Sequence, residues 1–346
     1  MNALLTPLSR PPFAKRHLLQ IGDLNRLEAL ELIERAEAFL PFTLAREKKL
    51  TTLKGRTLVN LFFENSTRTQ ASFAASRRDR VSALHVGARL VVPAGAAQTR
   101  SNDTDYAYRA HSAFAYLTGW GSDTVAGSVL VLEPTATGHE ATLYFRETAG
   151  RDSDEFYANS EIGEFWTGAR PTLAHVAADL GLSTAPLECL SSALNAPVAS
   201  TVGIDHDSGA EKSGTGLLQQ LSEMRLVKDE FELAELRTAV DATKLGFDDV
   251  IADLDEIAAH PRGERLVEGT FNRRARLEGN TVGYDTIAAS GTHACILHWT
   301  RNDGPVMPGD LILIDAGIEM DSYYTADITR TLPVNGRFSE VQRRVY

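Results

Sequence analysis

Apolar residues recur at helical spacing near the start of the chain. The residues that share this face are Leu24, Leu27, Leu30, Ile33, Ala36 and Leu40. Their spacing predicts an amphipathic helix, with Asp23 suited to cap its start and Pro41 ending it. Residues 57–63 form a short, β-rich apolar run that predicts a buried strand, and a helix from Asn65 or Ser66 towards Leu84 follows it.

Short β-rich runs dominate from residue 89 onward. The first set of expected strands covers residues 90–92, 113–118, 129–132 and 142–145. Helical patterns follow at residues 172–180 and 213–221, so an α/β domain is expected to extend to about residue 222.

A capping box of Asp229 with Glu232 predicts the start of a long helix. Its core candidates are Phe231, Leu236, Val240 and Phe247. A second helix is expected over residues 263–278. Further strands are expected at residues 296–299, 311–314 and 323–332. The pattern as a whole is typical of a chain with α/β and α+β parts.

Charge divides the chain into two unlike segments. Residues 1–80 hold 14 Lys and Arg against 8 Asp and Glu, a balance of +6, whereas residues 81–346 hold 21 against 38, a balance of −17. This break indicates either two joined segments or chance clustering on one surface. The acidic bulk argues against nucleic-acid binding.

Length and composition narrow the class of protein further. The 346 residues, 43% of them hydrophobic, can form two or three domains. Neither end has an apolar run near the roughly 20 residues of a membrane span, so no membrane or secreted protein is expected. Cys189 and Cys295 lie far apart without a CxxC pair, so neither a disulfide framework nor a thiolate zinc site is expected. The cytoplasm is the expected compartment.

Four polar residues follow the expected strand at residues 57–63: Ser66, Thr67, Arg68 and Thr69. At the positive end of a helix, their hydroxyls, guanidinium and free backbone N–H groups suit an anion. The same residue types also serve as ordinary helix caps.

The exact sequence around these residues makes the anion-binding interpretation more specific. Residues 17–73, through Glu64-Asn65-Ser66-Thr67-Arg68-Thr69 to Ser72-Phe73, resemble the start of aspartate carbamoyltransferase. That resemblance implies that Ser66, Thr67, Arg68 and Thr69 bind carbamoyl phosphate. The later substrate ligands of that family and its aspartate-binding domain have no counterpart here, so the segment is expected to be a fragment of about 73 residues.

Two carboxylates form the second chemical pattern. Asp315 closes the apolar run Leu311–Ile314, where an unpaired charge would be costly, and Asp327 follows twelve residues later. If the two runs form neighbouring strands joined around residues 319–321, both carboxylates can face a paired site for metals that prefer oxygen ligands. Alternatively, Asp327 pairs with Arg330 or with a Lys or Arg elsewhere, while Asp315 caps the following turn at Ala316-Gly317.

Residues 74–346 resemble aminopeptidase P, the Xaa-Pro aminopeptidases of the creatinase/prolidase superfamily. The resemblance rests on residues 101–106, 116–120, 224–229 and 296–302 and on the two Asp-bearing runs. It implies three parts: a carbamoyltransferase-like fragment at 1–73, an α/β domain at 74–222, and part of a pita-bread metallopeptidase domain at 223–346.

The resemblance also implies roles. Asp315 and Asp327 match two carboxylate ligands of a dinuclear, usually manganese, centre, and His298 matches a histidine beside the metals that assists with substrate. The expected substrate is a peptide with proline at its second position.

That family completes its site with a histidine and two glutamates further on, which this chain does not supply, so low activity is expected. The alternatives are a fragment that binds carbamoyl phosphate and a non-catalytic fusion product. Both families commonly form homo-oligomers.

Overall fold

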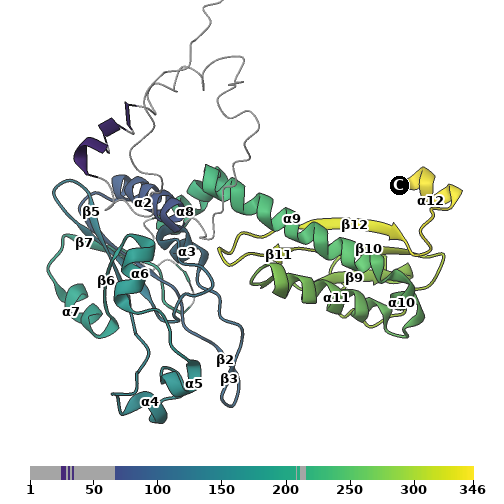
Figure 1. Cartoon of the computed structure of the whole chain (residues 1–346), viewed down its shortest axis with the longest axis horizontal. Helices are drawn as coiled ribbons and strands as arrows, with labels where there is room; N and C mark the ends of the chain where they lie inside the picture. The colour runs from purple at the N-terminus through teal and green to yellow at the C-terminus, as the bar shows by residue number, and fades with distance from the viewer. Residues whose placement is uncertain (1–24, 29, 32, 35–66, 208, 211–215) are drawn as a thin grey trace, which may run out of the picture. The chain divides into compact units, whose positions relative to one another are not determined.

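The computed structural model describes residues 25–28, 30–31, 33–34, 67–207, 209–210 and 216–346 (Figure 1). The chain divides into two compact units, residues 1–65 and 66–346. In the first unit, residues 26–28, 30–31 and 33–34 are helical, as expected. Asn25 caps this helix, because its Oδ1 accepts the N–H groups of Leu27 and Glu28, each at 3.0 Å. The expected cap, Asp23, lies outside the described residues. The expected strand at residues 57–63 lies outside the described residues.

The first part of the second unit contains a mixed five-stranded sheet with the order β6-β5-β4-β1-β7. These strands are β1 (Ala88–Pro93), β4 (Val129–Pro134), β5 (His139–Phe145), β6 (Ser183–Pro186) and β7 (Ser200–Gly203). The β1–β4 and β4–β5 pairs are antiparallel, whereas β1–β7 and β5–β6 are parallel. The short hairpin of β2 (Thr99–Ser101) and β3 (Thr104–Asp105) is separate from this sheet.

Side chains alternate between the two faces of this sheet, and each face carries a layer of buried apolar residues. Leu90, Leu130 and Leu143 are fully buried on one face, within the main core cluster. The helices packed around this region are α2 (Thr67–Leu84), α3 (Ser112–Thr118), α6 (Leu173–Leu180) and α8 (Leu217–Leu226). Val131 and Tyr144 belong to a smaller cluster. The remaining short helices are α4 (Glu155–Ala158), α5 (Glu164–Thr167), η2 (Leu187–Cys189) and α7 (Leu190–Asn195).

The strand expected at residues 113–118 is wrong, because these residues form helix α3. Ala113, Phe114, Tyr116 and Leu117 are all buried, so the run shows no polar face that would reveal a helical period. Gly119 ends the helix in the left-handed conformation, with φ of 73°.

The capping box at Asp229 is confirmed. The Asp229 carboxylate accepts the N–H of Glu232 at 2.9 Å, and the Glu232 carboxylate accepts the N–H of Asp229 at 2.9 Å. Helix α9 (Glu230–Ala252) begins there, and α10 (Leu254–Ala259) and α11 (Gly263–Glu278) follow. Of the core candidates on α9, Phe247 is buried, whereas Val240 is 45% exposed and was wrongly predicted.

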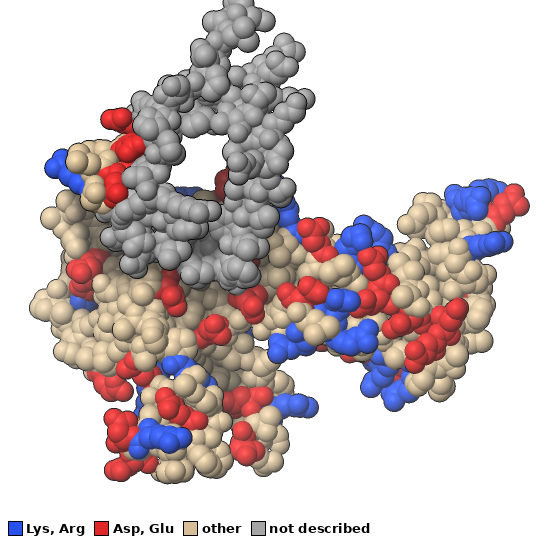
Figure 2. Space-filling view, in the orientation of Figure 1, with Lys and Arg blue, Asp and Glu red and all other residues tan. Residues whose placement is uncertain are grey.

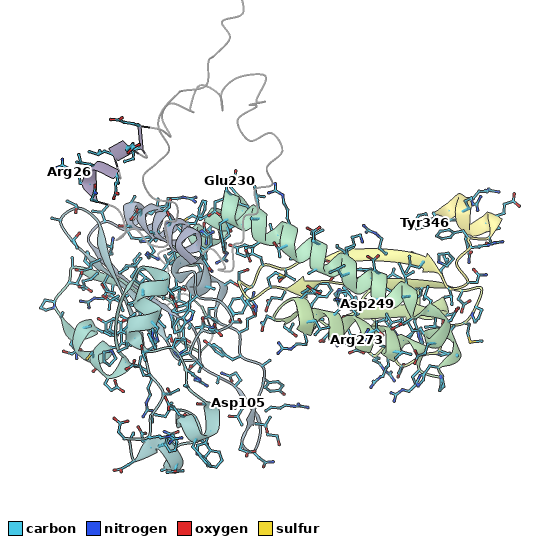
Figure 3. All side chains as sticks on the ribbon, in the orientation of Figure 1. Arg26, Asp105, Glu230, Asp249, Arg273 and Tyr346 are labelled. Atoms are coloured by element: carbon cyan, nitrogen blue, oxygen red, sulfur yellow. The ribbon has the colours of Figure 1, made fainter. Side chains whose placement is uncertain are left out.

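Ion pairs join α9 to α11. Arg274 Nε lies 2.8 Å from Asp249 Oδ2, and Arg273 lies 3.9 Å from the same oxygen; Figure 3 labels Asp249 and Arg273. Hydrogen bonding from Arg274 is the main cause that lowers the pKa of Asp249 below its ordinary value.

A three-stranded antiparallel sheet packs with α9 and α11 around a second core. Its order is β12-β10-β9, and the strands are β9 (Ile287–Ser290), β10 (Leu311–Ala316) and β12 (Ile328–Pro333). The short strands β8 (Thr281–Val282) and β11 (Ile318–Glu319) pair beside it. The 3-10 helix η3 (Gly291–Cys295) follows β9, and α12 (Glu340–Val345) comes near residue 346.

The strand expected at residues 296–299 is also wrong. These residues form a loop after η3, in which Leu297 is 88% exposed. A side-chain hydrogen bond from Trp299 to Glu264 holds this loop in place of a strand ladder.

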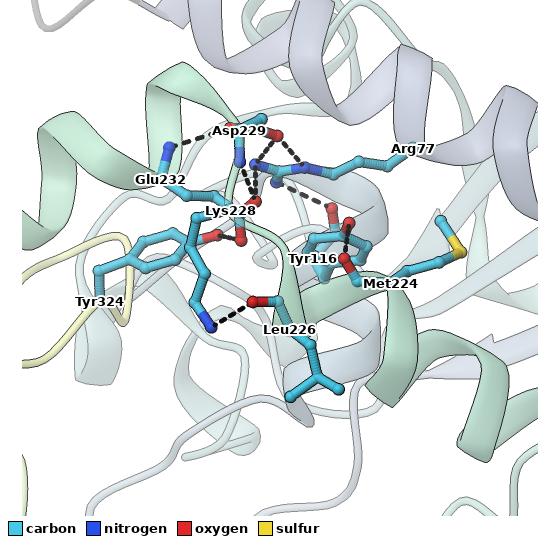
Figure 4. A network of polar contacts seen from close by, with 8 residues as sticks. All are labelled: Arg77, Tyr116, Met224, Leu226, Lys228, Asp229, Glu232 and Tyr324. Carbon is cyan, nitrogen blue, oxygen red and sulfur yellow. Dashed lines mark hydrogen bonds and ion pairs between the residues drawn. The ribbon is translucent and has the colours of Figure 1, made fainter.

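Helix α2 runs through residue 73 without interruption, and Arg77 ties it to the start of α9 (Figure 4). Arg77 is buried and donates from Nε and Nη2 to Asp229 Oδ2, at 2.9 and 2.7 Å. The division at residues 73 and 222 stays a prediction. Within the part of the chain that the structure describes, no helix is long and apolar enough to cross a membrane.

Candidate metal centre

The strand β10 and the segment before β12 carry the two candidate carboxylates. Ile312, Ile314 and Ala316 are fully buried on one face of β10, which leaves Asp315 half-buried on the other. Asp315 pairs with Thr329 in register, and Asp327 is exposed immediately before β12. The antiparallel pairing therefore places both carboxylates near the same end of the two strands.

A tyrosine hydroxyl joins the two carboxylates. The Tyr284 hydroxyl lies 2.6 Å from Asp315 Oδ1 and 2.9 Å from Asp327 Oδ1, within hydrogen-bonding distance of both. Burial first, and then hydrogen bonding to the two carboxylates, raises the pKa of Tyr284 well above its ordinary value. The phenol therefore remains a proton donor between two acceptors at neutral pH.

The alternative contacts considered for these aspartates are not formed among the described residues. Arg330 Nη1 donates to the carbonyl of Thr329, and no ion pair joins Arg330 to Asp327. Asp315 accepts from Tyr284, and no hydrogen bond joins its side chain to the following turn. The geometry therefore favours a shared site over separate structural uses.

Two carboxylate oxygens around one point suit a cation that prefers hard oxygen ligands. Among the described residues, however, no group of three or more His, Cys, Asp and Glu side chains could hold a metal ion. The donor set present here is thus compatible with a divalent ion and supplies two protein ligands.

Tyr284→Phe is expected to lower the free energy of unfolding by about 1–2 kcal/mol without divalent cations. The hydroxyl separates two negative charges, and phenylalanine leaves them without a donor. Added Mn²⁺ should reduce the difference from the parent chain, because a cation would supply the missing positive charge. Urea unfolding with and without Mn²⁺ measures both quantities; an equal loss in both conditions would contradict the shared role.

His298 is exposed in the loop after η3, and no hydrogen bond or ion pair engages its imidazole among the described residues. No such contact joins it to Asp315 or Asp327 either. Its role beside the metals therefore stays a prediction.

Glu264 on α11 holds the loop that carries His298. This fully buried carboxylate accepts from Gly304 N–H at 2.7 Å, Ser290 N–H at 2.9 Å and Trp299 Nε1 at 2.9 Å. His293 Nδ1 lies 2.8 Å away, and the His293 ring stacks on Trp299 with centroids 3.9 Å apart. Sequence reasoning missed both Glu264 and Tyr284, since neither belongs to a spacing that marks metal chemistry.

The structure describes only part of the candidate anion-binding segment, residues 66–69. Ser66 and the side chains of Thr67, Arg68 and Thr69 lie outside the part of the chain that the structure describes. The backbone of residues 67–69 forms the first turn of α2. The expected start of a helix at this element is therefore confirmed to within one or two residues.

Three family models match successive parts of the chain. Residues 73–201 match the aminopeptidase P N-terminal domain, and residues 234–346 match metallopeptidase family M24. Residues 16–103 match the carbamoyl-phosphate-binding domain of aspartate/ornithine carbamoyltransferases, which extends past the expected limit at residue 73. The predicted resemblance to aminopeptidase P, preceded by a carbamoyltransferase-like segment, is confirmed.

Individual proteins similar to this chain are named Xaa-Pro aminopeptidases or aminopeptidase P. The chain is 47% identical to Xaa-Pro aminopeptidase 1 of Streptomyces coelicolor over 289 residues, which cover 80% of this chain and 57% of that protein. It is 30% identical to the Xaa-Pro aminopeptidase of Escherichia coli, covering 80% of this chain and 65% of that one. The structure of Escherichia coli aminopeptidase P with the inhibitor Pro-Leu matches with a TM-score of 0.64 at 27% identity, over 80% of this chain and 65% of that one. The chain thus spans about 57–65% of the length of these relatives.

Proposed function

We propose that residues 73–346 carry part of the machinery of a metal-dependent Xaa-Pro aminopeptidase. Such an enzyme removes the N-terminal residue of a peptide whose second residue is proline. The observation that carries the proposal is the placement of Asp315 and Asp327 around one hydroxyl, within sequence that matches family M24. The names of the 47% identical relatives supply the reaction class and the expected substrate, a peptide with proline at its second position.

In this proposal each residue has a separate task. Asp315 and Asp327 hold divalent metal ions, for which manganese is our candidate. Such ions, when bound, polarise the scissile carbonyl and lower the pKa of water. The Tyr284 hydroxyl, with one proton to donate, lies within hydrogen-bonding distance of both carboxylates and so orients them. Glu264 holds the loop from which the exposed His298 approaches substrate.

Metal binding provides the direct test. Mn²⁺ titrated into the 346-residue chain is expected to bind weakly, because two carboxylates are the only ligands we assign. Asp315→Asn and Asp327→Asn should each weaken binding by about tenfold or more, since each removes a charged ligand. Asp241→Asn, which changes an exposed carboxylate on α9, is the matched control and should bind as the parent does. Equal Mn²⁺ affinity in all four chains would overturn the assignment.

Peptidase activity is a separate measurement. With only two assigned ligands, the chain by itself is expected to release the N-terminal residue of an X-Pro peptide at a trace rate in Mn²⁺. Rapid, manganese-dependent release by the purified chain would contradict this expectation and imply ligands that we have not identified.

Carbamoyl-phosphate binding is a second candidate, favoured by the match of residues 16–103 to that binding domain. Here Ser66, Thr67, Arg68 and Thr69 would hold the phosphate at the start of α2. Calorimetric titration with carbamoyl phosphate tests it: saturable heat that Arg68→Gln abolishes would support this function, and the absence of saturable heat would exclude it.

A further inference from the structure

A cavity of about 240 Å³ lies beside the start of α9, apart from the two candidate metal ligands. Its walls come from α2, α3, the connection between α8 and α9, and the turn at residues 322–324. Four cationic side chains and one carboxylate line it: Arg77, Arg109, Arg225, Lys228 and Glu232. On the face shown in Figure 2, acidic and basic side chains are interspersed.

Two of the four cations are paired. Arg77 lies 2.7 Å from Asp229 and 3.7 Å from Glu232. Arg109 Nε lies 2.7 Å from Glu319. These acids therefore neutralise Arg77 and Arg109.

The other two cations have no carboxylate partner among the described residues. Lys228 Nζ reaches only the carbonyl of Leu226, at 3.3 Å (Figure 4). Arg225 Nη2 donates to Ser222 Oγ at 3.2 Å, and its Nη1 is enclosed without an acceptor. Within the described part of the chain, Arg225 and Lys228 thus line the cavity without an ion-pair partner, and the nearby Glu232 offsets part of the charge of Arg225.

Partial burial makes the positive charge of Arg225 costly without an anion, whereas Lys228 is exposed. Desolvation lowers the pKa of Arg225 below its ordinary value. The nearby Glu232 carboxylate already accepts from the Tyr324 hydroxyl at 2.8 Å and from the N–H of Asp229. Gln70 of α2 also lines the cavity.

We propose that this cavity binds a small oxyanion, a phosphate or carboxylate group, between Arg225 and Lys228. A guanidinium forms paired hydrogen bonds with such a group, and an ammonium adds a compact point charge. The proposal does not depend on the aminopeptidase function, because it uses neither Asp315 nor Asp327.

Calorimetric titration of the 346-residue chain with inorganic phosphate, and separately with acetate, tests the proposal. We expect saturable binding of at least one anion, weakened about tenfold or more in Arg225→Gln and in Lys228→Gln, since each removes one of two charges. Arg225→Lys keeps the charge and should retain part of the affinity. Arg170→Gln removes an exposed arginine outside the cavity and should bind as the parent does.

Each other outcome overturns the site. Absence of saturable binding for both anions does so, as does equal weakening in the Arg170→Gln control, which would indicate a general charge effect. Binding that survives both cavity variants and disappears in Arg68→Gln would place the anion at residues 66–69 instead. Circular dichroism on each variant confirms that the fold is retained, and Arg225→Lys provides the folded comparison if Arg225→Gln is unstable.

Discussion

Gly317→Ala is expected to lower the free energy of unfolding by more than about 3 kcal/mol. A Cβ atom at this position would lie 1.6 Å from the carbonyl oxygen of Ala326 and 2.5 Å from its carbon. These are backbone atoms of the segment that leads into Asp327, so no side-chain rotation can relieve the overlap. The two segments would have to separate, and Asp315 would move away from Asp327.

The same change should therefore weaken Mn²⁺ binding together with stability. Urea unfolding gives the free energy, and the Mn²⁺ titration gives the affinity. Gly269→Ala is the matched control, because Gly269 lies within α11 and a Cβ there would meet no atom within 4 Å. It should raise stability by up to about 1 kcal/mol, since alanine favours a helix over glycine. Equal stability of the two variants would contradict the close approach at Gly317.

Glu264→Ala is the second large effect, with an expected loss of about 3 kcal/mol or more. The substitution leaves the N–H groups of Ser290, Gly304 and Trp299 without their buried acceptor. The loop at residues 291–304 should then loosen, and Trp299 should become more exposed to water. Urea unfolding and a red shift of tryptophan fluorescence measure the two consequences.

Glu264→Gln separates charge from shape. The amide keeps the size of the carboxylate but replaces one acceptor oxygen with an N–H₂ group that faces donors. We therefore expect Glu264→Gln to recover only part of the lost stability. Glu256→Ala, an exposed position on α10, should change stability by less than about 0.5 kcal/mol. If Glu264→Ala matched this control, the buried carboxylate would not hold the loop.

Local sequence patterns correctly predicted several helices and strands around the candidate metal ligands Asp315 and Asp327. The capping box at Asp229, helix α11 and strand β10 each depend on neighbouring residues or on a short period, and all three are present. The run at residues 113–118 was misassigned because burial on all sides removed the polar face that distinguishes a helix from a strand.

The amino-acid sequence by itself determined the family resemblance, the break between two charge segments and the pairing of Asp315 with Asp327 as candidate ligands. Only the tertiary structure decided which groups meet them. Tyr284 is 31 residues from Asp315 and 43 from Asp327, and Glu264 is 26 to 40 residues from three of its donors. Such contacts arise when separate elements pack, and no local period records them. That Arg225 and Lys228 form no ion pair within the described part of the chain became visible for the same reason, because whether a charge has a partner depends on the chain folded around it.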